Sequence, residues 1–308
     1  MASPADVSAY FELSRQMTHR HLKHLVESGK IKKVGSAPKV LYAAINDNTI
    51  ISNYQIDTET RQIIAQEFFF IEPTGTELSG IDGFEKWCHK RQFDIGKKAQ
   101  EFKQVIEKYQ KKKKSGLLDA TNKINKTFGN DCCVSQLFYF EFYAVEIFGR
   151  TKMGQKLFYA KQGKSRVRMK EIADLIKKSL MQLIESHNID SVAFVPPTVP
   201  REIQLMKVLE TELALSLASI KVEKIIGDVR VPQKTLKKLS DRIENAKHTF
   251  RINSAVRFKK TLIIDDAVGS GASINQIACK LKNAQNTEEV IGFAVTGSLN
   301  DFEVLTEV

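Results

Sequence analysis

The sequence has few of the residues that mark secreted, membrane or fibrous proteins. Its 308 residues include 4 cysteines, 7 prolines and 1 tryptophan. No apolar segment is close to the length of about 20 residues that is needed to span a bilayer. The cysteines, at positions 88, 132, 133 and 279, form no C-x-x-C motif and are too scattered for a disulfide framework. The N-terminus lacks the basic and then apolar pattern of a signal peptide. We therefore expect a cytoplasmic protein in a reducing compartment, with no membrane partner.

The net charge of +11 is unevenly distributed along the chain. Residues 1–45 hold 7 Lys and Arg against 3 Asp and Glu, residues 46–150 hold 15 of each, and residues 151–308 hold 25 against 18. Within the last part, Ile220–Lys260 alone has 12 basic and 4 acidic residues. Two separate basic patches are typical of proteins with two sites for phosphate-bearing ligands.

The N-terminal patch has the element order of a winged helix-turn-helix. A short amphipathic segment over Asp6–Leu13 is followed by Ser14, a suitable N-cap for a second helix that extends to Ser28. Gly29 ends that helix, and two strand-like segments follow over residues 31–34 and 39–45. The segment 13–31 resembles winged helix-turn-helix domains, and we assign residues 1–46 to that fold.

In this interpretation the second helix enters the major groove and the wing contacts the phosphate backbone. The residues predicted to bind nucleic acid are Arg15, Gln16, Thr18, His19, Arg20 and Lys23 on the helix and Lys32, Lys33 and Lys39 on the wing. A protein-interaction domain is the alternative, and the positive charge favours nucleic acid, either DNA or RNA–DNA. The three histidines of this segment have no Cys or further separated ligand beside them, so we predict no metal site here.

The C-terminal half carries a strand, an acidic pair, a small-residue loop and a helix in succession. Thr261–Ile264 has the composition of a buried parallel strand, and Asp265 and Asp266 follow it directly. Small residues over 269–273 then allow backbone amides to approach a phosphate at the positive end of the next helix. The two carboxylates can accept hydrogen bonds from neighbouring sugar hydroxyls.

These residues resemble the phosphoribosyl-diphosphate signature of type I phosphoribosyltransferases. The resemblance implies that Asp265 and Asp266 hold the ribose hydroxyls and act as the catalytic pair if the domain is active. It further implies that the 5′-phosphate is bound by Gly269, Ser270, Gly271, Ala272 and Ser273. Val192–Pro197 looks like a strand that enters the diphosphate loop, to which we assign Pro197 and Arg201. Mg²⁺ would accompany a diphosphate ligand, because such oxygen-rich groups need a hard cation.

The similarity covers about residues 150–308 and extends upstream to a ComF-like (competence-type) pattern. That pattern assigns Arg230, Gln233, Lys234 and Arg242 to a basic loop. The usual Thr-Thr of the phosphate loop is Gly269-Ser270 here, the Arg-Gly-Phe-Asn element is replaced from Arg201 onward, and the zinc-binding cysteines are missing, so no zinc is expected. Ligand binding is therefore better supported than phosphoribosyl transfer, and enzymatic activity stays open.

We predict an α/β protein with three parts. A winged helix N-terminal domain (1–46) and a mixed, largely helical connector (47–135) precede a phosphoribosyltransferase-type parallel sheet flanked by helices (136–308). The connector is predicted to contain one long helix over 83–114, and residues 46–150 have no net charge. It could serve as a spacer, a dimerisation surface or a partner surface, so homo-oligomerisation stays open.

The joining of these two domain types resembles accessory effectors, or toxins, of bacterial retron antiviral defence systems. The resemblance implies a reverse transcriptase and its branched RNA–DNA product as partners. Purine-repressor-like regulators share the domain order and are a second resemblance, and an active ComF-like transferase is a third interpretation. The large central segment and the basic segment Ile220–Lys260 favour the effector, and we find no base-specificity element for the transferase.

Overall fold

The computed structural model describes residues 2–34, 40–44, 55–197, 202–225, 236, 238–252 and 256–298. The chain divides into two compact units, the first comprising Met1–Thr58 and Glu85–Lys98 and the second comprising Glu59–Phe84 and Ala99–Val308. Among the described helices, none has the length and apolar character required to cross a membrane.

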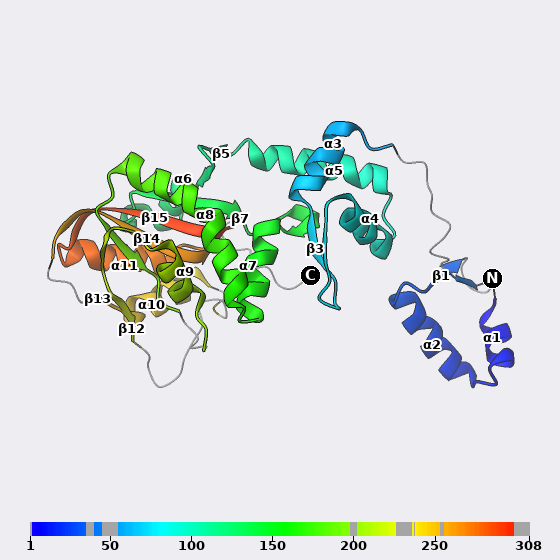
Figure 1. Ribbon diagram of the computed structural model, residues 1–308. Coiled ribbons are helices and arrows are strands. Elements are labelled where there is room, and N and C mark those ends of the chain that lie inside the picture. The colour runs from blue at the N-terminus through cyan, green and yellow to red at the C-terminus, as the bar shows by residue number, and fades with distance from the viewer. Residues whose placement is uncertain are drawn as a thin grey trace. The chain divides into compact units, whose positions relative to one another are not determined.

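The first unit begins with two helices and a two-stranded antiparallel sheet (Figure 1). The elements are α1 (Pro4–Tyr10), α2 (Arg15–Glu27), β1 (Ile31–Val34) and β2 (Leu41–Ala44). As predicted, Ser14 caps α2, since its Oγ accepts a hydrogen bond from the amide of Met17 at 3.3 Å. Gly29 follows the helix with a φ of 70°, a left-handed conformation that favours glycine.

The second unit is built on a seven-stranded sheet with the order β11-β10-β14-β15-β7-β6-β5. The strands are β5 (Lys113–Lys114), β6 (Leu117–Asp119), β7 (Gln136–Phe142), β10 (Ser191–Phe194), β11 (Ala218–Ser219), β14 (Phe258–Val268) and β15 (Thr287–Gly297). The strands from β11 to β7 are parallel, and β6 and β5 continue the sheet in antiparallel orientation. The predicted α/β class, with a mostly parallel sheet flanked by helices, is confirmed.

The sheet begins earlier in the sequence than residue 136, where the third domain was expected to start. β5 and β6 form a tight hairpin around Ser115 and Gly116, both of which have positive φ. Leu118 of β6 pairs with Tyr139 of β7, so the hairpin adds to the edge of the parallel strands. Its strands are too short to show a period in the sequence.

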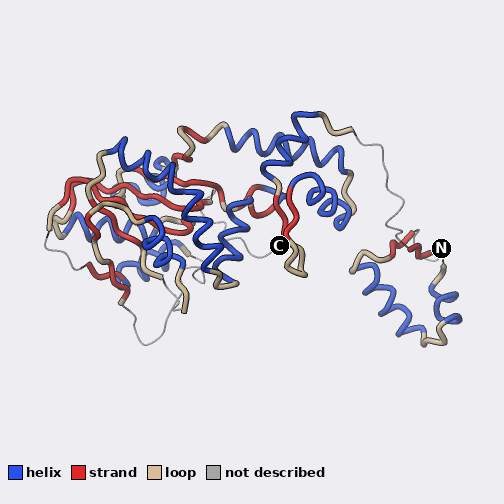
Figure 2. The backbone as a smooth tube through the Cα atoms, viewed as in Figure 1, coloured by secondary structure: helices blue, strands red, loops and turns tan. Residues whose placement is uncertain are grey.

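Figure 2 shows the remaining helices and smaller hairpins of the chain. The helices are α3 (Thr58–Glu67), α4 (Gly80–Arg91), α5 (Ile95–Gln110), α6 (Thr121–Phe128), η1 (Gly129–Asp131), η2 (Glu146–Phe148), α7 (Lys152–Gln162), α8 (Arg166–His187), α9 (Leu205–Leu213), α10 (Leu239–Thr249) and α11 (Ala272–Asn283). The hairpins are β3 (Phe69–Ile71) with β4 (Glu77–Ser79), β8 (Ala144–Val145) with β9 (Gly149–Arg150), and β12 (Val222–Lys224) with β13 (Phe250–Ile252).

The prediction of one long helix over residues 83–114 is wrong. Two helices, α4 and α5, occupy most of this range, and Lys113–Lys114 is a strand. Gln92 has a φ of 56°, which a continuing helix does not allow. Asp94 then starts the second helix, because its Oδ1 accepts a hydrogen bond from the amide of Lys97 at 2.7 Å. The apolar spacing is helical on both sides of the break, which is why the pattern alone did not show it.

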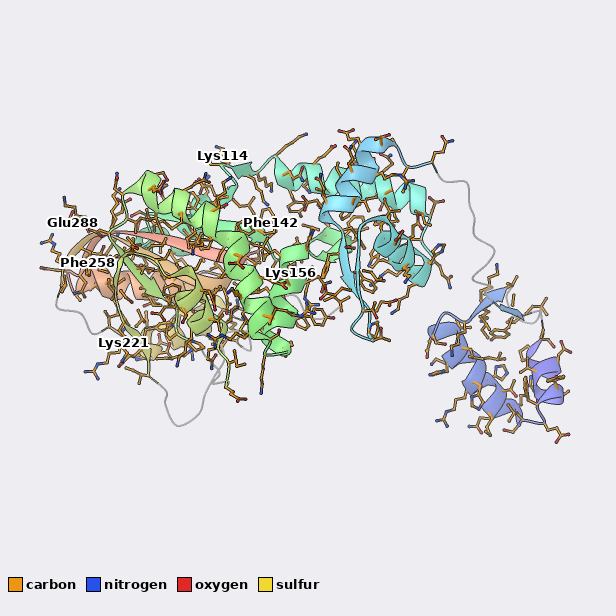
Figure 3. The ribbon with its side chains drawn as sticks, in the orientation of Figure 1. Lys114, Phe142, Lys156, Lys221, Phe258 and Glu288 are labelled. Carbon is orange, nitrogen blue, oxygen red and sulfur yellow. A yellow bond between two sulfur atoms is a disulfide. The ribbon has the colours of Figure 1, made fainter. Side chains whose placement is uncertain are left out.

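The parallel strands place their carboxyl ends at one edge of the sheet. Phe258 of β14 pairs with Thr287 of β15 at the amino ends, while Gly297 of β15 pairs with Phe142 of β7 at the carboxyl ends. Figure 3 labels Phe258 and Glu288 near the first of these edges and Phe142 at the other. In open α/β sheets, ligands bind outside the carboxyl ends of the strands.

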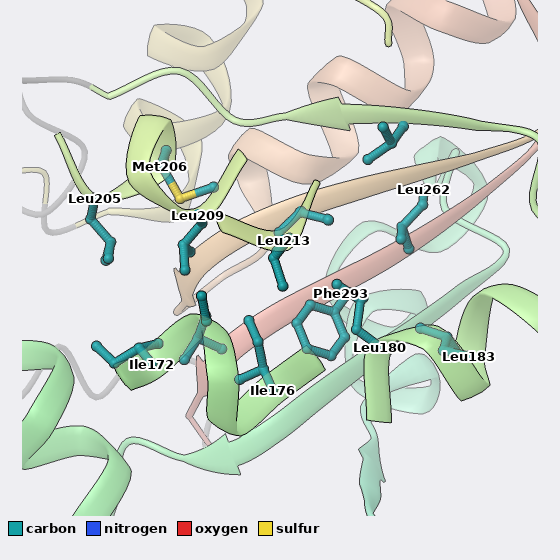
Figure 4. Close-up of a cluster of buried hydrophobic side chains, with 14 of the residues drawn as sticks. Ile172, Ile176, Leu180, Leu183, Leu205, Met206, Leu209, Leu213, Leu262 and Phe293 are labelled. Carbon is teal, nitrogen blue, oxygen red and sulfur yellow. The ribbon is translucent and has the colours of Figure 1, made fainter. Parts of the chain in front are cut away.

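Helices cover both faces of the sheet. On one face, Leu262 and Ile264 of β14 pack in a cluster with Ile176 and Leu180 of α8, together with residues of α7 and α9 (Figure 4). The intervening residue, Ile263, pairs with Gly292 and faces the other side, because strand side chains alternate. A Cβ on Gly292 would lie 3.2 Å from Ile274 Cγ2, so α11 packs closely against this second face.

Candidate ligand-binding site

The acidic pair lies inside the last part of β14 and not after it. The strand continues past Ile264 to Val268, and Asp265 and Asp266 are both half-buried. The amide of Asp266 donates a hydrogen bond to Asp265 Oδ1 at 2.8 Å, and Thr296 Oγ1 donates to the Asp266 carbonyl at 3.4 Å. The two aspartates are therefore consecutive residues near the carboxyl end of a central strand, and the Asp266 amide holds the Asp265 carboxylate.

A three-residue loop connects the acidic strand to α11. Gly269, Ser270 and Gly271 form it, while Ala272 and Ser273, predicted as loop residues, belong to the first turn of the helix. Gly271 is the N-cap and has a φ of 82°, a left-handed conformation. Ser270 is buried, and its Oγ accepts a hydrogen bond from the Ala272 amide at 3.4 Å. The first-turn amides and the helix dipole make this end of α11 attractive to an anion.

Charges surround the two carboxylates on several sides. Burial and the negative charge of Asp266 raise the pKa of Asp265 to about 7, against the lowering effects of the Asp266 amide, Lys161 and Lys224. Lys161 Nζ, at the end of α7, donates to Asp266 Oδ2 at 2.8 Å. Burial acts to lower the pKa of Lys161, but the charges of Asp266 and Asp265 outweigh it, so the pKa lies above its ordinary value.

Arg242, predicted from the basic loop, lies beside the small-residue loop. It belongs to α10 and is 5% exposed, and its Nε donates to the Leu236 carbonyl at 2.8 Å. The guanidinium is close to the loop backbone, because a Cβ atom built on Gly269 would lie 3.6 Å from Arg242 Nη1. Burial lowers the pKa of the guanidinium from its ordinary value, which still leaves it charged near neutral pH. The structure thus brings one predicted cation next to the predicted phosphate-binding loop.

Three lysines of the site were given no role from the sequence, and Lys123 is the most constrained of them. From α6, its Nζ donates to the Gly269 carbonyl at 2.9 Å, to the Ser298 carbonyl at 2.7 Å and to Ser298 Oγ at 2.8 Å. A Cβ on Gly271 would lie 3.1 Å from Ile124 Cδ1, so α6 also packs on the loop. Lys161 and Lys224 come from α7 and β12. These segments meet only in the folded chain, and no local motif marks them.

Of the remaining residues predicted for this site, one is described and four are not. Pro197 is half-buried and follows β10 by three residues. Arg201, Arg230, Gln233 and Lys234 lie outside the described residues. In the part of the chain that the structure describes, no three His, Cys, Asp or Glu side chains gather into a group that could hold a metal ion.

Two comparisons with known proteins give no match, one with protein-family models and one with curated proteins. Solved structures give weak matches. An adenine phosphoribosyltransferase is 14% identical with a TM-score of 0.29, over 44% of this chain and 72% of that one. A hypoxanthine phosphoribosyltransferase from Staphylococcus aureus is 15% identical with a TM-score of 0.27, over 42% and 73%. TM-scores this low do not establish a shared fold, so the functional proposal rests on the residues of the site.

In the first unit, most of the residues predicted to bind nucleic acid are exposed. They are Arg15, Gln16, His19, Arg20 and Lys23 on α2 and Lys32 and Lys33 on β1, while Lys39 lies outside the described residues. Thr18 was wrongly included, because it is 1% exposed and its Oγ1 donates to the Ser14 carbonyl at 3.1 Å. Thr18 shares the inner face of α2 with Leu22, four residues later, and not the outer face with the basic residues.

The structure also contains a disulfide that the sequence did not predict. Cys133, just before β7, is joined to Cys279 in α11, with their Cα atoms 5.0 Å apart. The neighbouring Asn275 holds the same segment, since its Oδ1 accepts from the Cys133 amide at 2.8 Å and its Nδ2 donates to the Asp131 carbonyl at 3.0 Å. The disulfide connects α11, which starts at the small-residue loop, to the segment just before β7. In the sheet, β7 is two strands away from the acidic strand β14.

Proposed function

We propose that the sheet-bearing unit binds a phosphoribosyl group, supplied by phosphoribosyl diphosphate or a nucleotide. One observation carries the proposal: two adjacent carboxylates near the end of central strand β14 are followed by a three-residue loop and the N-terminus of α11. Asp265 and Asp266 would accept hydrogen bonds from the ribose hydroxyls. The amides of the loop and first helical turn, with Arg242 beside them, would receive the 5′-phosphate.

The proposal for the whole chain adds nucleic-acid binding by the winged helix-turn-helix. The exposed basic residues of α2 support it, because Lys and Arg side chains are the usual partners of phosphates. We propose a nucleic-acid-bound effector of the retron type, whose partners would be a reverse transcriptase and its branched RNA–DNA product. The large central segment and the basic segment Ile220–Lys260 support this over a phosphoribosyl-diphosphate-sensing regulator. Gly269-Ser270 in place of Thr-Thr weighs against an active transferase.

The phosphoribosyl site can be tested by calorimetry with phosphoribosyl diphosphate. The double variant Asp265→Asn and Asp266→Asn keeps the side-chain size but removes the charged acceptors. We expect at least about a 100-fold loss of affinity, since two charge-assisted hydrogen bonds are lost. Glu288→Gln is the matched control, because Glu288 lies at the opposite end of the sheet in an exposed pair with Arg257 at 3.3 Å. Equal affinity of the double variant and the wild type would contradict the site.

Nucleic-acid binding can be tested through its salt dependence. Replacing Arg15, Arg20 and Lys23 with Gln should weaken binding and reduce the slope of log affinity against log salt by about 3. Replacing Lys177, Lys178 and Lys207, which are exposed on α8 and α9, removes the same charge elsewhere. A protein that carries no nucleic acid after purification and shows no salt-sensitive binding to DNA or RNA would refute this part of the proposal.

The identity of co-purifying nucleic acid separates the two regulatory interpretations. Material degraded in part by RNase and in part by DNase, as a branched RNA–DNA product would be, supports the retron-type effector. Duplex DNA alone, released when phosphoribosyl diphosphate is added, supports the transcription regulator instead. Release of diphosphate in the presence of a free base would support the transferase.

A further inference from the structure

Two lysines of the chain already balance the charge of the acidic pair. Lys161 Nζ contacts Asp266 Oδ2 at 2.8 Å, with the lysine side chain 35% exposed and the aspartate 20% exposed. The positive charge of Lys161 also acts on Asp265, as does that of Lys224 from β12. Both lysines precede the acidic pair in the chain, Lys161 by 105 residues relative to Asp266. Two carboxyl groups and two ammonium groups therefore act on one another at this edge of the sheet.

The residues present do not fit a resident magnesium ion at the acidic pair. Mg²⁺ requires near-octahedral oxygen coordination at about 2.0–2.1 Å and usually one or two carboxylates. Here Asp266 Oδ2 is bonded to an ammonium group and Asp265 Oδ1 accepts the Asp266 amide. A divalent ion at this position would have to displace or repel Lys161.

We propose that Lys161 is the built-in counter-cation of the acidic pair, so that the site binds the phosphoribosyl group without a divalent metal. The inference rests on the proposed function and replaces the expectation that Mg²⁺ accompanies the ligand. An ionised carboxylate has about four acceptor positions. One bond from Lys161 to Asp266 and one amide bond to Asp265 thus leave capacity for two sugar hydroxyls. Lys161 is a positioning residue: it fixes Asp266 and offsets its charge.

The position of Lys161 in the fold explains how its ammonium group can occupy the place of a metal ion beside the acidic pair. α7 ends at Gln162 and brings Lys161 to the carboxyl edge of β14, while Met153, Leu157 and Ala160 bury the opposite part of the helix in the core. The helix is therefore held by packing, independently of its contact with Asp266. A cation mounted on a packed helix has no dissociation equilibrium of its own, in contrast to a metal ion.

The proposal is tested by measuring the affinity for phosphoribosyl diphosphate in excess Mg²⁺ and in EDTA. For the wild type we expect the two dissociation constants to agree within about threefold. Lys161→Met should lose about tenfold or more in EDTA, because a charge-assisted contact is gone, and should recover part of that loss in Mg²⁺. Lys161→Arg retains the charge and should resemble the wild type in both buffers.

Lys156→Met is the matched control. Lys156 lies on the same helix and is labelled in Figure 3. Its Nζ forms an ion pair with Glu171 Oε2 at 3.2 Å and not with the acidic pair. The affinity of the Lys156→Met variant for phosphoribosyl diphosphate should be the same in Mg²⁺ and in EDTA. Melting temperatures in both buffers report whether each variant is folded. Wild-type binding that is lost in EDTA and restored by Mg²⁺ would overturn this inference and leave the proposed function intact. Failure of the wild type to bind phosphoribosyl diphosphate or ribose 5-phosphate in either buffer would overturn the proposed function itself.

Discussion

Asp265 gives the site a pH dependence that can be measured as protein stability. Burial and the Asp266 charge raise its pKa from 3.8 to about 7. The folded protein therefore holds the Asp265 proton more tightly than the unfolded chain does. Since unfolding releases this proton, the contribution of Asp265 to stability is greatest below about pH 4 and is lost as the pH rises to about 7.

The size of the effect follows from the pKa difference. A rise from 3.8 to about 7 corresponds to about 4 kcal/mol, at about 1.4 kcal/mol per pH unit. Asp265→Asn removes the ionisation and keeps the shape of the side chain. We expect the variant to raise the free energy of unfolding by about 2–4 kcal/mol at about pH 8. The gain should be about 2–3 kcal/mol smaller at about pH 5, where the folded wild type is already protonated.

The assay is urea unfolding of the wild type and variant at both pH values, followed by far-UV circular dichroism. That signal reports mainly the helices and strands of the sheet-bearing unit. Asp174→Asn, at an exposed position of α8, controls for the loss of a carboxylate from the surface. A variant that is less stable than the wild type at about pH 8, or whose gain is the same at both pH values, would refute this account of the acidic pair.

Two further predictions concern the framework of the site. Gly297→Ala should destabilise the protein by about 1–3 kcal/mol, because the added methyl group would overlap the buried ring of Tyr139; an unchanged urea midpoint would contradict this packing. Cys279→Ser should destabilise the oxidised protein by about 2–4 kcal/mol by opening the bond to Cys133. Cys132→Ser, at a free cysteine, should have little effect, and equal midpoints for both variants would speak against the disulfide.

The sequence predicted those features whose causes lie within a few residues. Ser14 and Gly29 delimit α2 because capping and left-handed backbone are local properties. The acidic pair with its small-residue loop was found in the same way, since the strand, loop and helix are continuous in the chain. Even here the strand end was misplaced. Pairing with β15 extends β14 through Asp265 to Val268, and a neighbouring strand is not visible in a local pattern.

The features that the sequence could not predict depend on contacts between distant segments. Lys123 bonds a loop residue 146 positions away, and Lys161 bonds an aspartate 105 positions away. A lysine in an amphipathic helix carries no sign of such a partner. Thr18 was placed on the wrong side of α2 for a related reason: the helical period defines two faces but does not say which one is covered when the apolar stripe is weak.

The bond between Cys133 and Cys279 makes a covalent ring of the chain between these positions, which are 146 residues apart. The ring contains Lys161, Arg242, the acidic pair and the small-residue loop, while Lys123 and β15 lie on the two arms outside it. A protease that cuts once anywhere within the ring leaves a single molecule of nearly unchanged mass. The same cut releases two fragments only after a reductant is added, so nicked protein would migrate as intact on a non-reducing gel.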